Sequence, residues 1–391
     1  MNHSSESSSS SSSAILPRTR RTRFVCISDT HNCTVKLPKG DVLIHCGDLT
    51  NQGSFSELKK QVTWLEKADF ECKLVIAGNH DLTLDTDFFD QYGGYFHNNT
   101  PQNPVDCQNL LTQSKTLIYL QHSSQVIKLS SPSGPKTTFN VFGSPYIPSC
   151  GKWAFQYPRS DSATAEAIWN DIPLDTDVLI THGPARTHRD ESRNRQSVGC
   201  ESLRQAMWRV RPRLALCGHV HEARGVERVR WDLSNKFVRY KELANTFQWE
   251  DPGLGNEKIC LVDLTIRGGM ALDNDGGKVP SSPSSPSPLP SKSTPVIHVA
   301  NGSMTMTQPE TQGRTGAMSE GASPGLGTRG LSGNPTSARS DGPGLIGRLG
   351  RRETCIVNCA IQAASYPHSG LRKLHKPIVV DIDLPVWDDH S

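Results

Sequence analysis

The chain contains five short apolar runs that each stop abruptly at Gly, Ser, Thr, Asp, Asn or His. The runs lie at 24–27, 42–46, 74–77, 178–180 and 214–217. Near-continuous apolar runs of three to five residues are typical of strands in a sheet that is covered on both faces. The chain therefore has to supply helices or a second sheet to cover these strands.

Helical patterns alternate with the apolar runs. Ser54 and Glu57 have the spacing of a capping box, which predicts a helix start. Apolar residues then recur at helical spacing and are expected in the core: Phe55, Leu58, Val62 and Leu65, with a second stripe at Leu203, Met207 and Val210. The alternation predicts an α/β fold in which loops at the carboxyl ends of the strands carry the unusual chemistry.

Composition divides the chain into one folded domain and two excluded segments. In segment 276–350, 37 of the 75 residues are Gly, Ser or Pro and none is Phe, Trp or Tyr. Such a segment cannot bury enough apolar area to offset its ordering entropy, so we expect a disordered insertion. Residues 1–21 are expected to be a disordered Ser-rich leader. Strand-like runs at 355–361 and 377–384 need a sheet to join, which predicts one domain over 22–270 and 351–386.

Charge, hydropathy and cysteine usage exclude several classes of protein. No stretch approaches the ~20 apolar residues of a membrane span. The formal net charge of +3 is too small for a dedicated nucleic-acid binder. The first 20 residues contain no apolar signal-peptide core, and several of the 11 cysteines lie in apolar runs. We therefore expect an intracellular, cytoplasmic protein; the basic run 18–23 leaves a nuclear signal open beside a solvated lead-in to a strand.

The polar residues after the apolar runs have the chemistry of metal ligands. They are Asp29, His31, Asp48, Asn79, His182, His219 and His221. In an extended segment residues i and i+2 point the same way, so Asp29 with His31, and His219 with His221, can face one site. Mixed imidazole and carboxylate ligands suit Mn, Fe or Zn better than Ca. Seven ligands are too many for one ion with an open position and suit two ions that share one carboxylate.

The motifs resemble those of a known superfamily, in the same order along the chain. They are Asp29-x-His31, Gly47-Asp48, Gly78-Asn79-His80-Asp81, Thr181-His182-Gly183 and Gly218-His219-Val220-His221. This set resembles the calcineurin-like metallophosphoesterases. Further stretches are similar to the metallophosphoesterase-domain-containing subfamily: 40–48, 142–145, 182–184, 198–200 and 211–212. The resemblance covers about 24–225, and the strand at 355–361 is similar to the closing strand of the family.

The resemblance implies a four-layer α-β-β-α sandwich with two mixed sheets, interrupted here by the long insertion. It also implies two divalent transition-metal ions, with Mn favoured over Fe or Zn. Asp29, His31 and His221 would hold one ion. Asn79, His182 and His219 would hold the other, and Asp48 would bridge them. His80 would protonate the leaving oxygen or stabilise charge on the phosphoryl group.

The function that this resemblance implies is a metal-dependent phosphoesterase. It would hydrolyse a small phosphodiester or phosphomonoester by in-line attack of a metal-bound hydroxide, and the subfamily suggests a cyclic-nucleotide phosphodiesterase. The alternatives are a metal-stabilised interaction scaffold, whose insertion recruits unknown partners, and a Ser/Thr protein phosphatase. An intact His80 favours the enzyme, because a scaffold needs no proton donor beside its metals.

Other residues near the motifs either contribute to the site or have structural roles. His45 is expected to be a packed core histidine. Arg186 and Arg189 follow a predicted metal ligand. They either bind a phosphate group or have a structural role, and the sequence leaves both open. The loop with Trp153, Phe155 and Tyr157 either stacks a flat ring or packs in the ordinary way. Four further arginines are expected on the solvated face and end of a helix: Arg204, Arg209, Arg211 and Arg213.

Overall fold

The fold is taken from a computed structural model of the chain. It describes residues 18–232, 241–243, 247–249, 260–274, 296–300, 303–307, 351–363 and 374–387. The remaining ranges, which include most of the expected leader and insertion, lie outside the described residues.

The first of two large sheets has six strands. Their order is β13 (Cys260–Leu264), β17 (Ile378–Pro385), β1 (Thr19–Ile27), β2 (Val42–Cys46), β3 (Cys72–Ile76) and β4 (Ile118–Tyr119). Strands β1, β2, β3 and β4 are parallel to one another, whereas β17 runs antiparallel to β1. The carboxyl ends of β1, β2 and β3 therefore meet at one edge of this sheet.

The second sheet has nine strands and is also mixed. Their order is β12 (Phe247–Trp249), β11 (Gly225–Arg230), β16 (Glu353–Asn358), β10 (Leu214–Cys217), β9 (Val178–Thr181), β6 (Thr138–Ser144), β5 (Ser123–Leu129), β14 (Val296–Ala300) and β15 (Ser303–Thr307). Strands β16, β10, β9 and β6 are parallel to their neighbours in that run. A small separate sheet pairs β7 (Ile147–Pro148) with β8 (Gln156–Tyr157).

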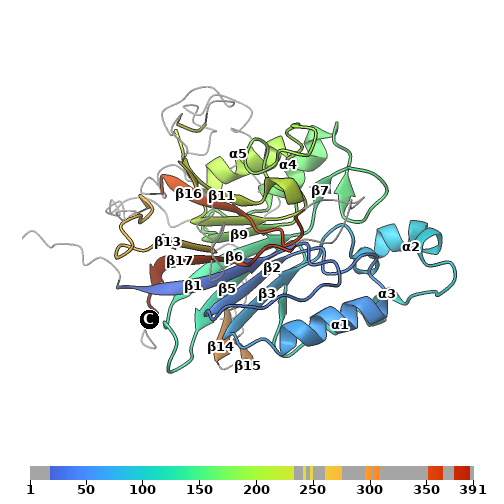
Figure 1. Cartoon of the computed structure of the whole chain (residues 1–391), viewed down its shortest axis with the longest axis horizontal. Helices are drawn as coiled ribbons and strands as arrows, with labels where there is room; N and C mark the ends of the chain where they lie inside the picture. The colour runs from blue at the N-terminus through green and yellow to red at the C-terminus, as the bar shows by residue number, and fades with distance from the viewer. Residues whose placement is uncertain are drawn as a thin grey trace, which may run out of the picture.

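The two sheets pack face to face with helices outside both (Figure 1). Buried side chains of both sheets, such as Phe24 and Ile44 from one and Phe139 and Leu216 from the other, form the central core. On the outer face of the first sheet lie α1 (Phe55–Glu66), α2 (Thr86–Phe96) and α3 (Pro104–Thr112), with the 3-10 turn η1 (Leu82–Leu84). The second sheet is covered by α4 (Ser162–Asn170) and α5 (Glu201–Val210), and η2 (His221–Ala223) follows β10. The expected four-layer α-β-β-α sandwich with two mixed sheets is confirmed.

Helix α1 begins where its sequence predicts. The Ser54 side chain accepts from the amide of Glu57, and the Glu57 carboxylate accepts from the amide of Ser54 at 2.9 Å, which completes the capping box. Leu58, Val62 and Leu65 are buried, but Phe55 is 37% exposed and was wrongly expected in the core. Within the described residues, no helix combines the length and the apolar character that crossing a membrane would need.

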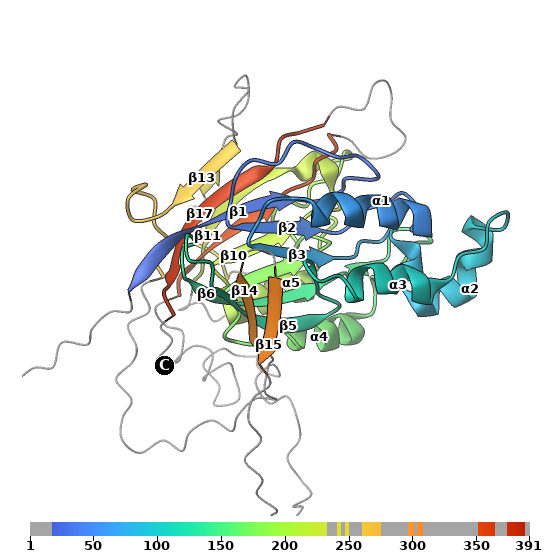
Figure 2. The ribbon, with the colours of Figure 1, turned by 90° about the horizontal axis from the view of Figure 1, so that it is seen from below.

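The segment after the insertion supplies one strand to each sheet (Figure 2). β16 pairs in parallel with β10 in the second sheet, and β17 pairs along eight residues of β1 in the first. Both strands are almost fully buried. Each of these strands lies largely within one of the two runs, 355–361 and 377–384, that the sequence marks as strand-like.

Two segment boundaries predicted from composition are wrong in part. Val296–Ala300 and Ser303–Thr307, inside the expected insertion, form a hairpin whose first strand pairs in parallel with β5. Ile297 and Val299 are buried there, which gives this short stretch apolar area to bury beside β5. Strand β1 also starts at Thr19, inside the expected leader, because it pairs with β17 as far as Pro385. Residues 1–17 and the rest of 276–350 lie outside the described residues.

The expected solvated face of arginines on α5 is also wrong. Arg209 and Arg211 are buried, and both direct their guanidinium groups at backbone carbonyls. Arg209 donates to the carbonyl of Ile172 at 2.8 Å, and Arg211 donates to that of Trp208 at 2.9 Å. Hydrogen bonds of this kind offset part of the cost of burying a guanidinium group.

Candidate metal centre

The candidate site lies where the carboxyl ends of strands from both sheets meet. Two hydrogen bonds join the sheets at this point. Nδ1 of His182, after β9, donates to the carbonyl of Cys46 at the end of β2, at 2.9 Å. The amide of His219, after β10, donates to the carboxylate of Asp29, after β1, at 3.0 Å. Loops from the two sheets are therefore locked against each other before any ligand is considered.

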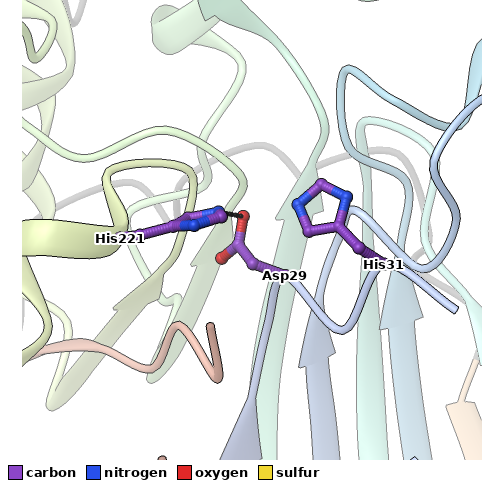
Figure 3. A group of neighbouring side chains, drawn as sticks. All are labelled: Asp29, His31 and His221. Atoms are coloured by element: carbon purple, nitrogen blue, oxygen red, sulfur yellow. Dashed lines mark ion pairs between the residues drawn. The ribbon is translucent and has the colours of Figure 1, made fainter. Parts of the chain in front are cut away.

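One group of candidate ligands consists of Asp29, His31 and His221. One possible ligand atom from each lies within 4.8 Å of the others, and all three residues are buried. Nε2 of His221 is 3.3 Å from Oδ1 of Asp29. Figure 3 shows the Asp29 carboxylate between the two imidazole rings, with a dashed line to His221. This is the set that would hold one ion according to the family resemblance.

A second group is formed by Asp48, His182 and His219, again with ligand atoms within 4.8 Å of one another. Nε2 of His182 is 3.4 Å from Oδ1 of Asp48 and 2.9 Å from Oδ1 of Asn79, so Asn79 joins this group. The other oxygen of Asp48 faces the first group, with Oδ2 at 3.5 Å from Nε2 of His31. Asp48 thus lies between the two groups, as its predicted bridging position requires.

Backbone carbonyls orient two of the imidazole rings. Nδ1 of His31 donates to the carbonyl of Thr50 at 3.1 Å, and Nδ1 of His182 donates to that of Cys46. In both rings Nε2 is the nitrogen that faces the carboxylate of Asp48. Metal-binding histidines usually use their second nitrogen in this way, because it fixes both the tautomer and the ring plane.

Four of the seven predicted ligands adopt a left-handed backbone conformation. Their φ angles are 54° at Asp29, 42° at His31, 55° at Asp48 and 65° at His219. Non-glycine residues seldom adopt this region, and such conformations concentrate at functional sites where surrounding contacts hold them. Here the amides of Asp29 and His31 donate to the carbonyls of Gly47 and Asp48, which holds the two loops in register.

Two glycines let the loops approach closely enough for the carboxylates to fit. A Cβ at Gly78 would lie 2.2 Å from the amide nitrogen of Asp48 and 2.7 Å from Cε1 of His182. A Cβ at Gly218 would lie 2.2 Å from Oδ2 of Asp29. Both contacts are far shorter than packing allows, so glycine is required at each position.

The histidines of the site differ in the direction of their pKa shifts. Burial lowers the pKa of His31 to about 4 and that of His219 to about 3, so both rings are neutral at neutral pH. Burial also acts to lower the pKa of His182, but the carboxylates of Asp48 and Asp29 outweigh it and raise the pKa to about 9. For Asp48 burial acts upwards, yet the neighbouring histidines hold its pKa well below the usual range. Ligation at His182 therefore has to displace a proton.

His80 lies at the solvent side of this centre. It is half-buried, and its geometry groups it with His31 and Asp48, within 4.8 Å. Its amide donates to Oδ1 of Asp48 at 2.8 Å, and its Nδ1 donates to the carbonyl of Asn51 at 2.9 Å. The ring also packs against the indole of Trp153, with centroids 4.0 Å apart. Its backbone and ring are thus fixed from three directions.

Asp81 is a supporting residue to which the sequence analysis assigned no role. It is fully buried and accepts four hydrogen bonds, from the amides of Leu49, Thr50 and Gly78 and the hydroxyl of Thr50. These bonds tie the loop after β2 to the loop after β3. Burial, reinforced by the charge of Asp48, raises the pKa of Asp81 to about 6. Its place in the motif 78–81 was the signal that could have identified it.

The remaining candidates have structural partners. His45 is fully buried and lies 2.9 Å from the hydroxyl of Thr30 through Nε2, which confirms it as a core residue. The guanidinium of Arg189 donates to the carbonyl of Val226, which supports a structural role over phosphate binding. Phe155 and Tyr157 are buried and pack in the ordinary way, whereas Trp153 remains half-buried beside His80.

The donor set fits two divalent transition-metal ions. Each group combines imidazole nitrogens with carboxylate oxygen, and Asn79 adds an amide oxygen to the second group. Such mixed nitrogen and oxygen ligands suit Mn, Fe or Zn. The carboxylate of Asp48 lies between the two groups, which is the arrangement expected for a pair of closely spaced ions.

Comparison with known proteins places the same region of the chain in a family. A family model described as calcineurin-like phosphoesterase matches residues 22–223, which is more than half of the chain. The human protein "Metallophosphoesterase domain-containing protein 1" is 41% identical over 215 residues, covering 52% of this chain and 62% of that protein. "UPF0046 protein K07C11.7" of Caenorhabditis elegans is 36% identical over 206 residues, covering 52% of this chain and 65% of that protein.

A third relative shares only a small part of its own length with this chain. "Probable rhamnogalacturonate lyase C" of Emericella nidulans is 43% identical over 216 residues, covering 55% of this chain but only 18% of that protein. The chain thus spans between 18% and 65% of the length of these three relatives. The family model spans residues 22–223, which include all seven predicted ligands, and this chain belongs to the calcineurin-like phosphoesterase family.

Proposed function

We propose that this chain hydrolyses phosphoester bonds at a centre of two divalent metal ions. The observation that carries the proposal is the position of Asp48, whose two oxygens face His31 in one ligand group and His182 in the other. Asp29, His31 and His221 would hold one ion, and Asn79, His182 and His219 the other. When bound, such ions lower the pKa of coordinated water and stabilise charge on a phosphoryl group.

The chain's own residues prepare this chemistry. The hydrogen bonds from Nδ1 of His31 and His182 to carbonyls aim Nε2 at the centre and keep those rings from turning. The strained loops at Asp29 and Asp48 hold their carboxylates in place without reorganisation. The low pKa of Asp48 keeps this shared carboxylate ionised over the whole physiological range.

His80 is our candidate for the residue that protonates the leaving oxygen. Nδ1 is occupied by the carbonyl of Asn51, so Nε2 is the atom available to hold and deliver a proton. The bond from its amide to Asp48 sets its distance from the shared carboxylate. A positioned acid of this kind contributes about 10²–10⁴-fold to the rate.

The proposal also specifies a metal, a class of substrate and a cellular compartment. We favour Mn and a small phosphodiester or phosphomonoester, with cyclic nucleotides as the first substrates to test. We also propose an intracellular site of action in the cytoplasm, with the nucleus open. In support, nine of the eleven cysteines are buried, where they pack as small apolar side chains, which suits a reducing compartment.

The test is an activity screen of the full chain after metal removal and reconstitution. Mn²⁺, Zn²⁺ and Fe²⁺ would each be added, and release of 4-nitrophenol would be followed from its phosphate monoester and its bis ester, then hydrolysis of cyclic nucleotides. We expect hydrolysis that depends on added metal. Protein that carries its metals yet hydrolyses none of these esters would support the scaffold alternative instead.

A further inference from the structure

A cavity of about 510 Å³ lies beside the candidate metal centre. It is formed between helix α2 and the loop at 151–156, at the end of the molecule where α2 projects (Figure 1). Its walls include Trp153, so we call it the Trp153 cavity. A volume of this size is within the range of small-molecule sites in proteins.

Trp153 is a wall shared by the cavity and the candidate site. Its indole lines the cavity and also packs against the ring of His80, at 4.0 Å between centroids. The next residue in the loop, Ala154, donates its amide to the carbonyl of Asn79 at 3.2 Å. Phe96 of α2 lies 5.6 Å from the indole, again between centroids. The loop is therefore fastened both to a predicted metal ligand and to the helix that closes the cavity.

The walls combine aromatic rings with negative charge. Phe88, Tyr92 and Tyr146 line the cavity together with Trp153, and the carboxylates of Asp85 and Asp87 lie among them. Burial raises the pKa of Tyr146, and both carboxylates add to that effect, which places all three groups around one space.

The two carboxylates of the cavity walls differ in how accessible they are to a ligand. Asp85 already caps α2, accepting from the amides of Phe88 at 3.1 Å and Phe155 at 2.6 Å. Asp87 is exposed and is the carboxylate more available to a ligand. Among the described residues that line the cavity, Lys152 is the one cation, and it lies over the ring of Tyr92 at 5.0 Å. The cavity therefore carries a net negative charge.

We propose that the Trp153 cavity binds the alcohol portion of the phosphoester substrate, and that it selects an aromatic group that is neutral or bears hydrogen-bond donors over one with a second negative charge. The inference rests on the proposed function. If His80 protonates the leaving oxygen, the group attached to that oxygen has to leave past His80. The surface next to His80 on that side is the indole of Trp153, which continues into the cavity.

The experiment compares four methyl phosphodiesters whose second alcohol has the same two-carbon link to a ring. The rings are phenyl, 4-aminophenyl, 4-carboxyphenyl and cyclohexyl. Because the leaving oxygen is chemically almost the same in all four, differences in kcat/KM report on the ring alone. With the Mn-reconstituted full chain we expect phenyl and 4-aminophenyl to exceed cyclohexyl and 4-carboxyphenyl by about tenfold.

Variants separate the cavity from the positioning of His80. Trp153→Ala should bring the phenyl and cyclohexyl esters to similar kcat/KM, and Trp153→Phe should keep most of the preference. Asp87→Asn should raise the relative rate of the 4-carboxyphenyl ester. Phe247→Ala, an exposed aromatic residue on β12, is the matched control and should change none of these ratios. If Trp153→Ala slows all four esters equally, the indole only supports His80 and the cavity inference is wrong.

Binding measurements keep this inference distinct from the proposed function. In the four corresponding phosphonates a P–C bond, which is not hydrolysed, replaces the bond from phosphorus to the leaving oxygen. These compounds would be titrated into the Mn-loaded protein by calorimetry. We expect their affinities to follow the order of the esters. Equal affinities would overturn the cavity inference even in an active enzyme. If the affinities follow the expected order but no ester is hydrolysed, the cavity inference is supported and the proposed phosphoesterase activity is contradicted.

Discussion

The backbone amide of His80 donates a hydrogen bond to Oδ1 of Asp48, at 2.8 Å. The same oxygen lies 3.4 Å from Nε2 of His182. One carboxylate oxygen thus connects the candidate proton donor with a candidate metal ligand from the other sheet. A change at Asp48 should therefore affect both ions and the position of His80.

The variant Asp48→Asn should lower metal content at both positions, because an amide replaces the one carboxylate that both groups share. The variant His221→Ala removes a ligand from one group and should leave about one ion per chain. Elemental analysis of the purified proteins measures the difference. Full occupancy and full turnover in Asp48→Asn would show that Asp48 does not bridge.

The variant His80→Ala should keep its metals and lose activity according to the leaving group. A proton donor matters most for a poor leaving group, so we expect a loss of about 10²–10⁴-fold on an alkyl or nucleoside ester. The loss on a nitrophenyl ester should be much smaller. Equal losses on both esters would instead assign His80 to charge stabilisation or positioning, and no loss on either would remove it from the reaction.

The variant Gly78→Ala should lose metal affinity and stability together. Its Cβ would lie 2.3 Å from Oδ1 of Asp48, so the two loops have to move apart. Gly94 of α2 is the control, because a Cβ there meets nothing within 4 Å. Gly94→Ala should be neutral or stabilise by up to about 1 kcal/mol. Thermal unfolding and metal titration of the two variants test this; equal behaviour would contradict it.

A second buried charge cluster predicts a pH dependence of stability away from the metal centre. His188 is buried between Glu227 and Glu242, with its ring nitrogens 3.2 and 3.3 Å from their carboxylates. Burial acts to lower the pKa of His188, but the two carboxylates outweigh it and raise the pKa to about 9. Because this folded-state value is above the unfolded value of about 6.5, the charged ring stabilises the fold fully below that pH and loses its effect as pH rises through 9.

Urea unfolding of the wild type and His188→Gln at about pH 6 and about pH 9.5 measures this contribution. The advantage of the wild type in free energy of unfolding should be largest at the lower pH and shrink at the higher one. The difference between the two proteins cancels other groups that titrate in this range. A constant difference would mean that His188 is not charged in the folded state.

Local patterns in the sequence were sufficient for the elements that position the site. The apolar runs before Asp29, Asp48 and His182 are buried and form strands β1, β2 and β9. Each strand ends close to the glycine or polar residue that follows its run. The capping box at Ser54 likewise marks the start of α1. The site residues converge because parallel strands expose their carboxyl ends at one edge. Their individual roles as ligands or acid remain proposals.

Features that depend on distant partners were not predictable in this way. The alternation of Val296, Ile297, His298 and Val299 is a strand signal, but it is outweighed by the Gly, Ser and Pro around it, and only the free edge of β5 makes it a strand. Arg211 reads as a solvated charge until its donors meet the carbonyls at the end of α5. Asp81 has no evident role until the loop after β2 and the loop after β3 meet around it.

Two bound ions are expected to make this chain a phosphoesterase. The decisive experiment titrates Mn²⁺ into the metal-free full chain while bound metal and the hydrolysis of bis(4-nitrophenyl) phosphate are measured in the same samples. We predict that hydrolysis rises with filling of the second position and reaches its maximum at about two ions per chain. Protein that binds both ions and hydrolyses no faster than its metal-free form would contradict the account.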